Sequence, residues 1–355
     1  MVKRLPLAGS RVAALLLVLA CTGATLPAAG RVSVGGGYGD FPLEPVFHAL
    51  PENMELLRLE NGMQVVLMRN AAQPMVGIYT QVKVGSACED ERTSGMSHML
   101  EHLLFNGTEK YDQDELYALT DRIGAYNNAN TSDFYTNFMT VLPAGELAAG
   151  VELQSQMLFH SLIPAEKFAK EQGIILGELV QARDWPGRAR DVTLRNVLFA
   201  GSSLELPTLG TRSTIANLTR DDVHAFYRTW YVPNTMVLTV AGNFDRDELV
   251  ALLQEHYGSV APGTVPAAPF VPARPIEQTR AVTRRAGDER TVALAFEAPT
   301  WGMADFYPFL VLTELLGLEG SGLLTQVLAE LDPSVRPEPS IWWEKAPGFG
   351  RLIVQ

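Results

Sequence analysis

Short β-rich runs and longer helical patterns alternate along this chain. Runs of β-branched, aromatic and other apolar residues, bounded by turn-forming residues, predict strands at residues 63–68, 75–84, 128–142, 236–241, 291–296 and 350–355. Apolar residues at helical spacing predict helices at residues 94–105, 164–184, 245–257, 306–316 and 323–331. The first two strands are separated only by a short turn segment, so we expect them to be neighbours in one sheet. Interspersed strands and helices predict an α+β fold, with a mixed or antiparallel sheet packed with helices.

A proline-rich segment divides the chain. Residues 261–275 contain five prolines in fifteen residues, and proline extends the chain and denies it ladder hydrogen bonds. We predict that this linker separates a domain at residues 51–260 from a second one at residues 276–355. The second segment is small for independent stability and ends within a predicted strand, so we expect it to be incomplete.

The N-terminal segment has the pattern of an export signal. A basic start precedes nine apolar residues at 12–20, a run too short to span a bilayer as a permanent helix. We predict a signal peptide at residues 1–29 and a flexible, glycine-rich lead-in at residues 30–50. Cys21 and the three residues before it resemble a bacterial lipobox, in which Cys21 would be lipidated, whereas residues 22–24 offer an ordinary cleavage site. Both alternatives predict export to the periplasm, and a lipid on Cys21 would be the only membrane attachment.

Composition narrows the functional class. The chain carries 28 basic and 40 acidic residues, a formal charge of −12, which argues against nucleic-acid binding because phosphate neutralisation needs a basic surplus. Hydrophobic residues make up 47% and charged residues 19%, a balance typical of a folded chain and not of a disordered one. Removal or lipidation of Cys21 leaves Cys88 without an intramolecular partner, so no internal disulfide is expected.

The stretch at residues 97–107, SHMLEHLLFNG, carries the candidate chemistry. On a helix with Ser94 as its expected N-cap, His98 and His102 lie four residues apart on one face, and Glu101 lies beside them. Two imidazoles at that spacing can hold one metal ion, and the carboxylate between them can reach a water on that ion. The order H-x-x-E-H is the reverse of the H-E-x-x-H motif.

Two histidines leave a hydrolytic zinc site one protein ligand short, because catalytic zinc typically takes three. The predicted helix at residues 164–184 offers Glu171 and Glu178, seven residues apart and therefore on one stripe. A carboxylate from this helix would complete the set, and the spacing alone does not choose between the two.

Residues 97–108 resemble the inverzincin signature of the pitrilysin/insulinase family of zinc peptidases, which includes mitochondrial processing peptidase and two-domain periplasmic proteins of bacteria. The family's third ligand is a glutamate well beyond the second histidine, and Glu178, 76 residues past His102, takes that place. The resemblance therefore implies one Zn²⁺ per chain on His98, His102 and Glu178. It matches Glu171 to a second family glutamate that supports the site without binding the metal. Further matches extend from about residue 55 to residue 331 and lie at residues 84–86, 128–133, 209–211, 218–219 and 230–242.

The resemblance implies a zinc-dependent endopeptidase that acts on extended peptides or small unfolded proteins. Glu101 would take a proton from water and pass it to the leaving amine. Asn128 and Ala129 match an edge strand that pairs with the substrate backbone. The family also implies that residues 276–355 begin an inactive second domain of the same type, and that the chain forms a homodimer or a heterodimer with a related chain.

Two alternatives remain open. A non-catalytic or partner-dependent subunit is one, although the intact motif argues against a silent chain. A zinc hydrolase that acts on a different class of substrate is the other. In active family members the distal part, or a partner chain, supplies an arginine and a tyrosine, and neither can be placed in this sequence, so activity is expected to need the missing part or a partner.

Overall fold

The structure is a computed structural model, and it describes residues 51–185, 187–266, 270–276, 292–317, 322–331, 339–346 and 349–355. The predicted signal peptide at residues 1–29, with Cys21, and the predicted lead-in at residues 30–50 lie outside the described residues.

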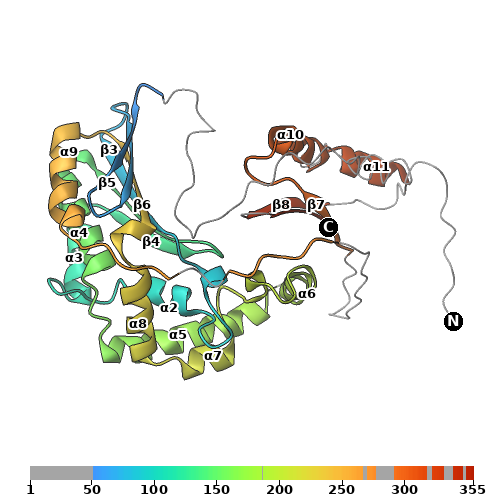
Figure 1. The fold of residues 1–355 in the computed structure, drawn as a ribbon, viewed down its shortest axis with the longest axis horizontal. Helices are drawn as coiled ribbons and strands as arrows, with labels where there is room; N and C mark the ends of the chain where they lie inside the picture. The colour runs from blue at the N-terminus through green and yellow to red at the C-terminus, as the bar shows by residue number, and fades with distance from the viewer. Residues whose placement is uncertain are drawn as a thin grey trace. The chain divides into compact units, whose positions relative to one another are not determined.

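A six-stranded sheet forms the centre of the first part of the chain, with the strand order β1-β2-β6-β3-β5-β4 (Figure 1). Its strands are β1 (Met54–Arg58), β2 (Gln64–Arg69), β3 (Met75–Val82), β4 (Tyr126–Thr131), β5 (Thr136–Pro143) and β6 (Met236–Gly242). Strands β2 and β6 are parallel, and all other neighbours are antiparallel. The predicted α+β class with a mixed sheet is therefore confirmed.

The prediction that the first two β-rich runs are neighbours is wrong, because β6 lies between them. Val66 of β2 pairs with Thr239 of β6, and Ile78 of β3 pairs with Val240. The alternate side chains of β6, among them Leu238 and Val240, are fully buried. A strand with such a face is covered best at the centre of a sheet, and this burial outweighs the short connection between β2 and β3.

Residues 128–142 form a hairpin and not one strand. Strands β4 and β5 pair in antiparallel register, with Ala129 opposite Phe138, and the amide of Ser132 donates to the carbonyl of Tyr135 at 2.8 Å across the turn. The turn is tied to the rest of the domain through Asp133, described below. The four consecutive polar residues at 130–133 mark the end of β4 and the start of the turn.

Helices pack around this sheet. They are α2 (Met96–Leu103), α3 (Gln113–Arg122), α4 (Leu147–Phe159), α5 (Ala165–Arg183), α6 (Arg188–Leu198), α7 (Arg212–Asn217), α8 (Arg220–Trp230) and α9 (Arg246–Leu253). Helix α4 packs on β3 and β5, and α9 packs on α4. Helix α2 contacts β4, α5 and α8, and Figure 1 shows α2, α5, α7 and α8 grouped together. These contacts place α2 between the edge of the sheet and α5.

A buried polar residue joins α4 to the sheet. Gln154 is 1% exposed, accepts from the hydroxyls of Thr80 and Tyr257 at 2.6 and 3.2 Å, and donates to the carbonyl of Ile78 at 3.1 Å. Because every polar atom of this side chain has a partner, the polar contact adds specificity to an otherwise apolar interface.

The described residues beyond position 291 form a second sheet, with the order β7-β9-β8. It comprises β7 (Leu294–Ala298), β8 (Ile341–Ala346) and β9 (Phe349–Val354), accompanied by α10 (Phe306–Gly317) and α11 (Leu323–Leu331). The two helices and the strands β7 and β9 were predicted, and β8 was not. The domain limits at residues 260 and 276 stay predictions. In the part of the chain that the structure describes, none of the helices combines the length and the apolar character needed to cross a membrane.

Candidate metal centre and active site

Helix α2, which carries the two histidines, begins at Met96, and the buried carboxylate of Glu89 lies seven residues before it in the sequence. The prediction of Ser94 as its N-cap is wrong, since Gly95 is the N-cap and has no side-chain capping bond. The carboxylate of Glu89 instead accepts from the amides of Gly95 and Ser97, both at 2.7 Å. Burial raises the pKa of Glu89 to about 7, and the bonds from Ser97 and Gly95 oppose the rise. Glu89 thus satisfies the helix N-terminus from outside the helix.

Helices α2 and α5 bring three potential metal ligands together. The Nε2 atom of His98 lies 3.7 Å from one carboxylate oxygen of Glu178, and the Nε2 atom of His102 lies 3.6 Å from the other. One ligand atom from each of the three residues lies within 4.8 Å of the other two. The cluster joins side chains from two helices that are distant in sequence.

The donor set and its spacing fit a zinc ion. Both nitrogen-to-oxygen distances exceed the range of hydrogen bonds, so no proton shared directly between the groups accounts for the approach. In a tetrahedral site with zinc bonds of about 2.0–2.1 Å, neighbouring ligand atoms are roughly 3.3 Å apart, close to the separations here. Two imidazoles and a carboxylate are also a ligand set that zinc accepts in hydrolytic sites.

The surroundings of each histidine suit this arrangement. Burial, and then the charge of the adjacent His102, lower the pKa of His98 to about 4, so this imidazole is neutral near pH 7. The Nδ1 atom of His102 lies 3.0 Å from a carboxylate oxygen of Glu171, whose side chain is buried. A proton held between these atoms leaves the Nε2 lone pair of His102 facing Glu178. Glu171 and Glu178, between which the sequence spacing did not choose, therefore lie on opposite sides of the His102 ring.

Glu101 lies next to the cluster and is held by the sheet. The hydroxyl of Thr131, the last residue of β4, donates to its carboxylate at 2.6 Å. Burial raises the pKa of Glu101, the charge of nearby Glu178 adds to the rise, and the bond from Thr131 opposes it. The sequence interpretation gave Thr131 no role, although its position at the end of an edge-strand motif that follows Asn128 and Ala129 was a usable signal.

Asn128 and Ala129 lie on β4, which is the last strand in the sheet order. The Asn128 side chain is exposed, donates to the hydroxyl of Tyr126 at 2.7 Å and accepts from the amide of Ala129 at 2.9 Å. Among the described residues, no strand covers the outer edge of β4. The strand therefore offers an edge that ends beside Glu101.

Other residues of the edge-strand motif have a structural part. The carboxylate of Asp133 accepts from the hydroxyl of Ser86 at 2.8 Å, and a single nitrogen of Arg195, Nη2, donates to its two oxygens at 2.9 and 3.0 Å. A hydrogen bond between two charged groups is shorter and stronger than one between neutral groups. The contact with Arg195 ties the turn between β4 and β5 to α6, and so anchors the edge strand near the candidate site.

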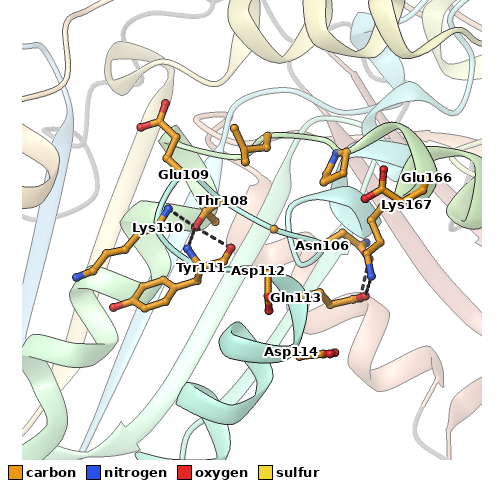
Figure 2. Close-up of a pocket in the computed structure, with 13 residues that line it drawn as sticks. Asn106, Thr108, Glu109, Lys110, Tyr111, Asp112, Gln113, Asp114, Glu166 and Lys167 are labelled. Carbon is orange, nitrogen blue, oxygen red and sulfur yellow. Dashed lines mark hydrogen bonds between the residues drawn. The ribbon is translucent and has the colours of Figure 1, made fainter.

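A separate pocket has a volume of about 340 Å³ (Figure 2). It is lined by residues from the loop between α2 and α3, from the start of α3 and from the start of α5, including Asn106, Lys110, Gln113 and Lys167. Figure 2 shows Asn106, Gln113 and Lys167 close together and joined by hydrogen bonds. Asn106 belongs to the motif at residues 97–108, but sequence reasoning gave none of these four residues a functional role.

Two protein-family models match this chain. The family model described as "Insulinase (Peptidase family M16)" matches residues 64–212, and the model described as "Peptidase M16 inactive domain" matches residues 217–332. An uncharacterized zinc protease of Bacillus subtilis is 29% identical over 273 residues, covering 76% of this chain and 66% of that protein. The beta subunit of the mitochondrial-processing peptidase of Blastocladiella emersonii is 30% identical over 268 residues, covering 74% of this chain and 56% of the relative.

Solved structures show the same fold. A protease from Helicobacter pylori superposes with a TM-score of 0.77 at 22% identity, over 86% of this chain and 74% of that one. The chain spans about half to two thirds of the length of the two relatives from Bacillus subtilis and Blastocladiella emersonii. Two family models that together extend from residue 64 to residue 332, and relatives named as zinc proteases, lead to one conclusion: this chain belongs to the insulinase family of peptidases, M16.

Proposed function

We propose that this chain is the metal-bearing part of a zinc-dependent endopeptidase that hydrolyses peptide bonds in extended peptides or small unfolded proteins. One observation carries the proposal: Glu101 lies beside the cluster of His98, His102 and Glu178 and is bonded to the last residue of an edge strand, β4. Binding groups for a metal, a candidate base and a candidate peptide-binding edge therefore meet at one place.

His98, His102 and Glu178 would hold the zinc ion. When bound there, zinc supplies a Lewis acid that polarises a scissile carbonyl and brings the pKa of a coordinated water towards neutrality. Glu171 would keep the proton of His102 on Nδ1 and so direct the Nε2 lone pair to the ion.

Glu101 would act as the general base. Its raised pKa brings the carboxylate nearer to the working pH, which improves both the uptake of a proton from water and its later delivery to the leaving amine. The hydroxyl of Thr131 holds one carboxylate oxygen and leaves the other for this transfer.

Strand β4 would receive the substrate as an added strand. Backbone hydrogen bonds supply affinity in this mode with little dependence on side chains, which suits extended and unfolded substrates. The amide of Ala129 is occupied by Asn128 in this structure, so Asn128 must turn away before that amide can bind a peptide. A ferredoxin protease of similar fold, 18% identical to this chain, has been solved in complex with Arabidopsis ferredoxin, and this supports a protein as the substrate.

The proposal extends to the partner and to the location of the chain. The relative named as a beta subunit supports assembly with a second chain, as a homodimer or a heterodimer, and a partner or a distal segment would complete the substrate chamber. The basic and apolar start of the sequence supports export to the periplasm, with or without a lipid on Cys21.

The full chain with Glu101→Gln tests the proposal. This variant should keep one zinc ion per chain and lose about 10²–10⁴-fold in the rate of cleavage of an unstructured peptide, the range for loss of a general base. Glu91→Gln, an exposed change of the same kind in the same segment, should cleave at the wild-type rate. A Glu101→Gln protein that binds zinc and cleaves as fast as the wild type refutes the mechanism. A wild-type chain without zinc and without activity would favour the non-catalytic subunit.

A further inference from the structure

A line of hydrogen bonds runs from the pocket in Figure 2 to the candidate metal centre. The ammonium of Lys167 donates to Oε1 of Gln113 at 2.5 Å, and Nε2 of Gln113 donates to Oδ1 of Asn106 at 2.6 Å. Nδ2 of Asn106 then donates to Oε1 of Glu171 at 3.3 Å, and the other oxygen of Glu171 meets Nδ1 of His102 at 3.0 Å. The line thus joins a lysine on α5 to an imidazole on α2.

The two ends of this line dictate its direction. A lysine ammonium has only donors, so it accepts no bond and requires the oxygen of the Gln113 amide to face it. The nitrogen of Gln113 must then face Asn106, and the nitrogen of Asn106 must face Glu171. Each amide is therefore held in one of its two orientations, and the donors along this line run in one direction, from Lys167 to Glu171.

The middle of the line is buried. Asn106, Gln113 and Glu171 are 3%, 9% and 6% exposed, so water competes little for these bonds. Asn106 also donates to the carbonyl of His102 at 2.8 Å, and it therefore holds both the backbone of that histidine and the carboxylate that faces its ring. A carboxylate fixed at one oxygen presents the other to the ring in one direction.

We propose that Asn106, Gln113 and Lys167 are positioning residues of the metal centre. They hold the Glu171 carboxylate in the orientation that keeps the proton of His102 on Nδ1 and aims its Nε2 lone pair at the metal ion. This inference rests on the proposed function in one respect only, that His102 binds zinc.

Charge provides a sharp test, because three conservative variants each make the surroundings of the site more negative. They are Asn106→Asp, Gln113→Glu and Lys167→Met. If local charge alone mattered, all three would bind a cation more tightly. If the line of hydrogen bonds positions Glu171, each variant should instead bind zinc more weakly. Asn106→Asp removes the donor to Glu171, and Gln113→Glu draws the Asn106 amide away from Glu171. Lys167→Met leaves both amides free to turn.

The measurement is the zinc affinity of the full chain, prepared without metal and titrated against a chromophoric chelator. We expect about a 10–100-fold loss of affinity for Asn106→Asp and for Gln113→Glu, the range known for residues that orient metal ligands, and a smaller loss for Lys167→Met. The absorption spectrum of the Co²⁺-loaded chain should change in the same variants. Lys170→Met, an exposed lysine on the same helix, supplies the effect of charge alone and should not weaken binding.

Gln113→Glu separates positioning from stability, because the side chain of Gln113 bonds to Asn106, Tyr117 and Lys167 and reaches the metal centre only through Asn106. A purely structural role for these residues would lower the unfolding temperature of the metal-free chain and leave the zinc affinity of the folded chain unchanged. Asn106→Asp and Gln113→Glu chains that fold and bind zinc as tightly as the wild type would overturn the proposal. Because the titration needs no cleavage, a wild type that binds zinc but cleaves no peptide, either alone or assembled with a partner chain, refutes the proposed function and leaves this test intact.

Discussion

Two glycines meet where the histidine-bearing helix α2 begins, and Gly95→Ala should destabilise the domain there. Gly95 has a φ of 93°, in the left-handed region, which costs an L-residue roughly 1–2 kcal/mol. A Cβ atom on it would lie 2.9 Å from Cα of Gly210 and 2.6 Å from Cδ1 of Ile215. Overpacking of this kind costs roughly 1–3 kcal/mol, so the total is roughly 2–5 kcal/mol.

The assay is thermal unfolding of the metal-free chain, followed by circular dichroism. For a domain of this size, roughly 2–4 °C per kcal/mol predicts a lower Tm by roughly 4–20 °C for Gly95→Ala. Zinc affinity should fall as well, because Gly95 lies three residues before His98 and relief of the overlap must shift the start of α2. Gly210→Ala, whose Cβ would lie 2.5 Å from the carbonyl oxygen of Ser94, should have the same effect.

Gly173→Ala provides the matched control. Gly173 is exposed within α5, and no atom lies within 4 Å of a Cβ built on it. The same substitution should therefore raise stability by roughly 0.5–1 kcal/mol, as expected for glycine to alanine within a helix. If Gly95→Ala and Gly173→Ala chains had the same Tm, the close approach of α2 to Gly210 would not constrain the domain, and the reasoning would be wrong.

Two further predictions concern buried polar groups. The pKa of Glu89, about 7 in the folded chain, lies above its ordinary value, so the stability that it contributes is complete at low pH and is lost as the pH rises through 7. The unfolding free energy of the metal-free wild type, measured with urea and relative to that of Glu89→Gln, should rise by about 2 kcal/mol between about pH 8 and pH 5.5. A difference in unfolding free energy that does not change with pH would contradict the raised pKa of Glu89. Gln154→Leu leaves the buried hydroxyls of Thr80 and Tyr257 without their acceptor and should lower the unfolding free energy by about 1–3 kcal/mol for each, whereas an unchanged urea midpoint would show that the hydroxyls find other partners.

The part of the site that depends on one helix could be predicted from the sequence. His98, Glu101 and His102 lie on one face because the helical repeat puts residues three and four positions apart side by side, whatever the rest of the fold does. Fold class was also predictable, since alternating β-rich and helical segments restrict the packing of layers.

Features that depend on distant partners were not predictable. The place of β6 within the sheet is decided by the burial of its alternate residues, and no local pattern records which strands will cover them. The N-terminus of α2 is capped by Glu89, eight residues before Ser97, and not by the nearer Ser94. In both cases a long-range contact outweighs a local preference.

The choice between Glu171 and Glu178 shows how packing turns an ambiguous pattern into a definite geometry. Seven residues of helix rise about 10.5 Å, so the two carboxylates are separated along α5 by roughly the width of one imidazole with a contact on each side. His102 occupies that interval, 3.0 Å from Glu171 at Nδ1 and 3.6 Å from Glu178 at Nε2. A spacing of three or four residues would rise only about 4.5–6 Å, which is less than this interval. The seven-residue spacing that left the third ligand undecided in the sequence is therefore what allows one helix to orient the histidine and to offer the metal a ligand.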